Sequence, residues 1–185
     1  MNGDELSRRA FCAGLGATSA LFAVVPAFAA TGRANLTARG MTSTTAMAAQ
    51  KMEQLRSLTW GFDAEGLGLP LTDTTTNVAV YPPTPTGTGL NPSPVDALER
   101  NTPGFVDFVD ENGGWVGTGN LPPGTARYIR RWSIEPLPTN PNNTIVIQVL
   151  VSPVSDEMRR GESIFSRTRM PGDALLITVK TRKAS

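Results

Sequence analysis

The N-terminal third of the chain carries two consecutive hydrophobic patterns. Residues 10–32 form an uncharged apolar run that follows Arg8 and Arg9. Over residues 41–59, apolar and small side chains recur at spacings of three and four, which predicts one stripe along an amphipathic helix. The members of this stripe are Met41, Thr45, Ala48, Met52, Leu55 and Thr59. A helix over residues 11–58 would be roughly 70 Å long, about twice what a bilayer core requires.

Beyond residue 60 the pattern changes to short β-type segments separated by turns. Pro and Gly are frequent in residues 61–101, which we expect to be loop apart from one short strand at 76–80. Asn112-Gly113 predicts a tight hairpin turn. The expected strands are 105–109, 114–117, 127–135, 144–151 and 175–181. A helix followed by mostly antiparallel strands predicts an α+β fold, with the helix packed against one sheet face.

Composition narrows the possible chemistry. The chain has no His, which removes the commonest general base and metal ligand, and its only Cys is Cys12. The sequence contains neither a Gly-rich phosphate loop nor a G-x-S-x-G motif. The net charge of +1 does not favour nucleic acid as a partner. We therefore expect a protein that is not an enzyme, with no catalytic residues, no cofactor and no metal.

Two groups of mostly charged residues are candidates for binding an ion or a phosphate. The acidic group is too closely spaced for a calcium loop, so we expect solvated carboxylates beside a turn; it consists of Asp107, Asp110, Glu111 and Asn112. Strand alternation puts Arg127 and Arg131 on one face and Arg130 on the other, so they form no single patch. Four further arginines are expected to be solvated in a loop: Arg159, Arg160, Arg167 and Arg169.

The N-terminus fits an export signal. Ser7-Arg8-Arg9-Ala10-Phe11 resembles the S-R-R-x-F core of twin-arginine signals, and the apolar run follows it. Pro26 precedes Ala27-Phe28-Ala29, a small-x-small cleavage pattern that would make Ala30 the first mature residue. This interpretation predicts a soluble periplasmic binding or interaction protein.

The same residues also fit a prepilin-like leader. In type IV pilins and pseudopilins a short basic leader is cut before a Phe or Met that begins a long helix, and Ala10-Phe11 would be that junction. The family usually has Glu at the fifth mature position, where this chain has Leu15. Three cleavage states thus stay open: after Ala10, after Ala29, or none.

Residues 46–56, with the sequence A-M-A-A-Q-K-M-E-Q-L-R, resemble the second half of the long helix in PilV-like minor pilins. Residues 128–138 and 179–183 also resemble strands of the heads of these proteins. The resemblance implies a minor pilin-like subunit of a type IV pilus or a type II secretion-like pseudopilus. Its implied partners are other pilin subunits and inner-membrane assembly machinery. Its implied location is the inner membrane, with a periplasmic head.

The resemblance also implies a domain plan. Residues 1–10 would be a basic leader and residues 11–60 a long helix with a membrane half and an amphipathic half. Residues 61–101 would be a variable loop region and residues 102–185 a β-sheet head.

Overall fold

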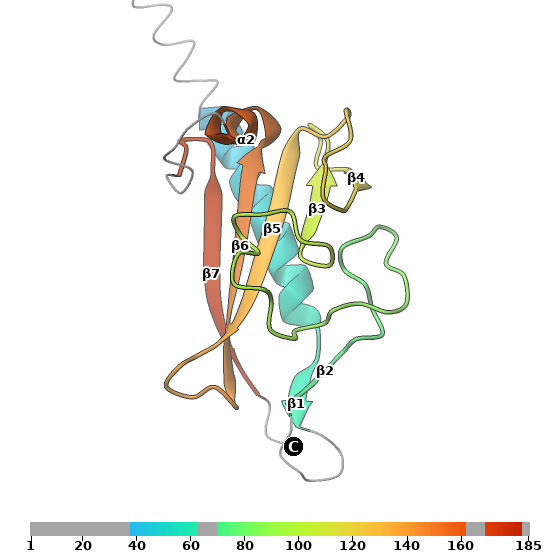
Figure 1. Ribbon diagram of the computed structural model, residues 1–185, viewed down its shortest axis with the longest axis vertical. Coiled ribbons are helices and arrows are strands. Elements are labelled where there is room, and N and C mark those ends of the chain that lie inside the picture. The colour runs from blue at the N-terminus through green and yellow to red at the C-terminus, as the bar shows by residue number, and fades with distance from the viewer. Residues whose placement is uncertain (1–37, 63–69, 162–168, 183–185) are drawn as a thin grey trace, which may run out of the picture. The chain divides into compact units, whose positions relative to one another are not determined.

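The computed structural model describes residues 38–62, 70–161 and 169–182. Contacts divide the chain into two units, Met1–Gly40 and Met41–Ser185, and the fold described here is that of the second unit. The first helix of the described chain occupies residues 38–57, and its part within the second unit, residues 41–57, lies against a β-sheet (Figure 1).

The main sheet has five strands in the order β4-β3-β5-β6-β7, and every neighbouring pair is antiparallel. The strands are β3 (Val106–Val109), β4 (Trp115–Gly117), β5 (Tyr128–Pro136), β6 (Thr144–Pro153) and β7 (Ala174–Thr181). A separate antiparallel pair joins β1 (Trp60–Phe62) to β2 (Pro70–Thr72). The second helix, α2 (Val154–Gly161), follows β6 directly.

The predicted α+β class, with a helix on a mostly antiparallel sheet, is confirmed. All five expected strands of the main sheet are present, and Gly113 occupies the predicted hairpin turn with a φ of 82°. The membrane half of the predicted long helix lies outside the described residues. Within the described residues no helix is both long and apolar enough to span a bilayer.

Two predictions of local structure were wrong. Residues 76–80 form no strand; only an isolated bridge pairs Asn77 with Thr84, in a segment that prolines interrupt. Arg159 lies on α2 rather than in a loop. This helix has Asp156 and Glu157 in its first turn, where acidic side chains stabilise the positive end of the helix dipole.

The core lies between the first helix and the sheet face formed by alternate residues of β5 and β6. Trp132, Ile134, Ile147 and Val149 are fully buried there. The helix contributes Met47, Ala48, Met52 and Leu55 to the same cluster, and Leu58 joins it directly after the helix ends.

The predicted helix stripe was correct in its middle only, where Ala48, Met52 and Leu55 are buried. Met41 is 48% exposed, and Thr45 is exposed, with its hydroxyl donating to the Met41 carbonyl. Thr59 is also exposed and lies beyond the end of the helix. The buried face continues through Thr44 instead. With 3.6 residues per turn, residues 44 and 45 are both near neighbours of residue 48, and the sheet covers the side that residue 44 occupies.

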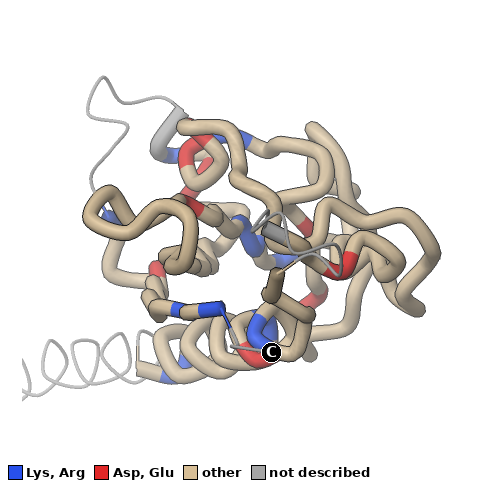
Figure 2. Tube along the Cα trace, turned by 90° about the horizontal axis from the view of Figure 1, so that it is seen from below, with Lys and Arg blue, Asp and Glu red and all other residues tan. Residues whose placement is uncertain are grey.

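Few residues along the trace are charged, and most of it is tan in Figure 2. Three of the buried charged residues, Lys51, Asp107 and Arg130, meet between the first helix and the sheet.

Candidate functional site

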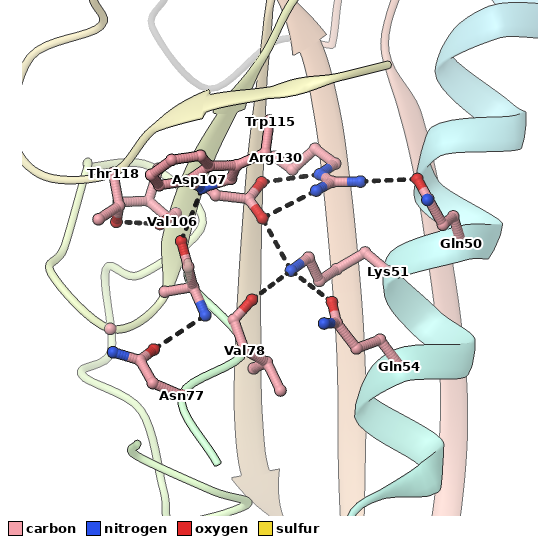
Figure 3. A network of polar contacts seen from close by, with 12 residues as sticks. Gln50, Lys51, Gln54, Asn77, Val78, Val106, Asp107, Trp115, Thr118 and Arg130 are labelled. Carbon is pink, nitrogen blue, oxygen red and sulfur yellow. Dashed lines mark hydrogen bonds and ion pairs between the residues drawn. The ribbon is translucent and has the colours of Figure 1, made fainter. Parts of the chain in front are cut away.

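A buried ion pair joins the first helix to β3. Lys51 lies on the buried helix face, between Ala48 and Leu55, and Asp107 lies within β3 with its side chain toward the helix. Lys51 Nζ is 2.7 Å from Asp107 Oδ2, and each side chain is 1% exposed (Figure 3).

Arg130 on β5 is the second cation at this carboxylate. Strand register places Arg130 directly opposite Asp107. Arg130 Nε donates to Asp107 Oδ1 at 2.7 Å, and Nη2 donates to Asp107 Oδ2 at 2.9 Å. This two-pronged geometry is the strongest form of an Arg–carboxylate pair. Arg130 Nη1 donates to Gln50 Oε1 at 3.0 Å, which ties β5 to the helix as well.

Each donor of Lys51 has an acceptor. Besides Asp107, Nζ donates to the Val78 carbonyl and to Gln54 Oε1, both at 2.7 Å. Nζ also lies 4.7 Å from the centre of the Trp132 ring, a cation–π distance. Through these contacts Lys51 connects the helix with β3 and with Val78.

Burial lowers the pKa of Lys51 to about 8, and the nearby Arg130 also lowers it, while the attraction of Asp107 opposes both effects. Lys51 is therefore mostly protonated at pH 7. The cluster then contains two cations and one anion, all three at most 7% exposed. It carries an excess of one positive charge in a region of low dielectric constant.

A cavity of about 450 Å³ opens beside this cluster. Its polar lining comes from the helix and the sheet, and its apolar lining includes Val78, Val80 and Trp115. Trp115 Nε1 donates to the Ala79 carbonyl at 3.0 Å, which fixes the ring in place. The full lining is Gln50, Lys51, Gln54, Val78, Val80, Tyr81, Asp107, Gly113, Gly114, Trp115 and Arg130.

The expectation that Asp107 is solvated was wrong. Asp107 is fully buried because it lies on β3, all of whose residues are buried. Its charge is compensated there by ion pairs with Lys51 on the helix and Arg130 on β5. The sequence carried a signal: Lys51 lies on the apolar helix stripe, three residues after Ala48, and Asp107 interrupts an apolar strand. Two opposite charges at inward-facing positions favour an ion pair, because a buried charge is costly without a partner.

Asp110 takes part in the turn instead. Its Oδ1 accepts the backbone N–H groups of Asn112 and Gly114, both at 2.8 Å. Among the described residues, no group of three or more acidic, Cys or His side chains could hold a metal ion.

The predicted placement of Arg130 and Arg131 on opposite faces of β5 is confirmed. Arg131 points away from Arg130's side of the sheet, and its Nη2 lies 2.7 Å from Glu157 Oε1 on α2. Arg127 precedes β5 and is exposed. Arg159 pairs with Asp156, and Arg169 is exposed. The structure therefore does not gather these arginines into one patch.

The candidate processing residues all lie outside the described residues. They are Arg8, Arg9, Ala10, Phe11, Ala27, Ala29 and Ala30.

Comparisons with known proteins gave no match: no family model matches the chain, no curated protein matches it, and no solved structure matches it.

Proposed function

We propose that this protein is a minor pilin-like structural subunit of a type IV pilus or a type II secretion-like pseudopilus. The apolar run would hold the subunit in the inner membrane and then pack with neighbouring helices in the filament core. The β-sheet unit would face outward. The sequence resemblance suggests this role, and several features of the described unit support it.

The observation that carries the proposal is the outward face of the first helix. Between Arg39 at its start and Glu53 and Arg56 near its end, this exposed face has small or uncharged side chains. Within residues 41–49 the exposed residues are Met41, Thr42, Thr45, Ala46 and Ala49. Small side chains allow helices to approach closely, as packing in a helical filament core requires.

The ion network supports the same role. A subunit that transmits load from its helix to its head needs the two joined firmly, and Lys51 with Gln50 attaches the helix to two strands. Lys180 of β7 adds a contact at the helix end, where Nζ donates to the carbonyls of Arg56 and Leu58.

Strand β7 supports contact with neighbouring subunits. It lies at the edge of the five-stranded sheet, with β6 as its partner among the described strands. Ile177 and Val179 on this strand are 59% and 57% exposed. An apolar edge strand is suited to pairing with another chain.

Leu15 refines the proposed role. The family Glu at this mature position is thought to help subunits dock, and Leu carries no charge. We therefore propose an initiating, capping or modifying subunit rather than the bulk subunit of the filament.

A second candidate is a twin-arginine-exported soluble periplasmic binding protein. The 450 Å³ cavity with Lys51 and Arg130 in its lining favours it, because binding proteins need a cavity with convergent polar groups.

N-terminal sequencing of the mature protein from separated membrane and periplasmic fractions tests the choice. The subunit proposal predicts a start at Phe11, or an intact N-terminus, in the membrane fraction. A start at Ala30 in the soluble periplasm would refute the membrane-anchored mechanism and support the second candidate.

A further inference from the structure

The cavity beside Lys51, Asp107 and Arg130 has an unbalanced charge. Asp107 is shared by two cations, so one positive charge in the cluster has no anion to match it. The carboxylate of Asp110, in the adjoining turn, is not part of the cavity lining and accepts backbone N–H groups. A buried excess charge is costly until a counter-charge approaches.

The cations also orient two amides. Gln50 Oε1 accepts from Arg130 and Gln54 Oε1 accepts from Lys51, so each carbonyl end faces a cation. Their Nε2 groups then point away from the cations and have no recorded partner among the described residues. Arg130 uses three of its five N–H donors on Asp107 and Gln50, which leaves two. The lining is thus rich in free donors.

The remaining wall is apolar and the volume suits a small organic molecule. Val78, Val80 and Trp115 provide apolar surface, and Tyr81 stands at the opening, 69% exposed. About 450 Å³ lies within the usual range of ligand pockets, roughly 300–1,000 Å³.

We propose that this cavity binds a carboxylate that carries a small apolar or aromatic group. The carboxylate oxygens accept from the Nε2 groups of Gln50 and Gln54 and from the remaining Arg130 N–H groups. The apolar part lies against Trp115. The carboxylate belongs either to a free organic acid or to a peptide, and the proposal does not depend on the protein being a filament subunit.

Titration of the purified full-length chain with benzoate, followed by NMR, tests this site. The indole N–H of Trp115 and the side-chain amides of Gln50 and Gln54 report directly on the cavity. We expect saturable shifts of these signals with a millimolar dissociation constant, and at least about tenfold weaker binding of the neutral isostere benzamide. Equal binding of the two compounds, or no saturable shift with benzoate or with the peptide probe below, would overturn the proposal.

Matched variants separate the site from general charge attraction. Gln50→Leu removes an exposed donor from the lining together with the acceptor of Arg130 Nη1, and it leaves the contacts of Asp107 with Lys51 and Arg130 in place. We expect it to weaken benzoate binding about tenfold. Arg56→Gln removes a cation from the same helix outside the cavity, and we expect unchanged binding. If Arg56→Gln weakens binding as much as Gln50→Leu does, the attraction is non-specific and the proposal fails.

A peptide probe identifies the source of the carboxylate. A tetrapeptide ending in Phe with a free carboxylate is compared with its C-terminal amide. Stronger binding of the free-carboxylate peptide than of benzoate assigns the cavity to a peptide end, and the reverse assigns it to a small organic acid. The result is independent of N-terminal processing, so the cavity and the filament proposal can fail separately.

Discussion

The buried cluster predicts that its members differ strongly in their effect on stability. Asp107→Asn would leave Lys51 and Arg130 facing each other without an anion, each at most 7% exposed. Lys51→Met would instead leave the two-pronged Asp107–Arg130 pair intact and electrically balanced.

The magnitudes follow from these contacts. Removing one partner of a buried ion pair costs about 3–5 kcal/mol when a charge is left unmatched, and Asp107→Asn leaves two. Lys51→Met deprives the Val78 carbonyl of its donor, which costs about 1–3 kcal/mol. It also abolishes the desolvation that lowers the Lys51 pKa from 10.5 to about 8, a gain of roughly 3 kcal/mol at neutral pH. The net change for Lys51→Met should therefore lie between about zero and a gain of about 2 kcal/mol.

Urea unfolding at pH 7, followed by tryptophan fluorescence, measures both variants. We expect Asp107→Asn to lower the free energy of unfolding by at least about 2 kcal/mol more than Lys51→Met does. The double variant should regain part of the loss, because only Arg130 would remain without an anion. Equal losses in the two single variants, or no recovery in the double variant, would refute the assignment of Asp107 as the shared anion.

Two further predictions concern the lysines. Because the Lys51 pKa in the folded state lies below 10.5, the unfolded chain holds a proton between pH 8 and 10.5 that the folded chain has lost. Stability attributable to Lys51 should thus rise by up to about 3 kcal/mol over this interval, measured as the difference from Lys51→Met in urea unfolding at each pH; a flat difference would contradict it. Lys180→Met removes the donor to two carbonyls at the end of the first helix. We expect a loss of about 1–2 kcal/mol and faster amide exchange in the last helical turn, and unchanged exchange there would contradict the capping role.

Much of the fold was predictable because local patterns and tertiary packing agree. The β6 strand is rich in Ile and Val, and Asn112-Gly113 needs no long-range contact to turn the chain. The expected strand at 76–80 failed because a short β-type sequence among prolines has no neighbouring strand with which to pair. The helix α2 was missed because its eight residues are too few for a clear periodic signal.

The candidate site was not predicted because its residues come from three distant segments. Lys51, Asp107 and Arg130 each have an ordinary solvated interpretation when considered alone. Only the pairing of Asp107 with Arg130 across β3 and β5, with the helix above them, brings the charges together. The helix stripe was misjudged at Met41 and Thr45 for a related reason, since the sequence does not specify how far the sheet extends along the helix.

In the proposed function, the apolar N-terminal run holds the protein in the membrane. Alkaline carbonate extraction of membranes from cells that make the full-length chain measures this retention most directly, with an Arg8→Lys/Arg9→Lys variant to test dependence on the twin-arginine pair. We expect both proteins to stay in the membrane pellet after extraction, because a membrane helix needs the positive charge and not the arginine pair itself. Release of the wild-type protein into the soluble fraction, with loss of export in the double-lysine variant, would contradict it.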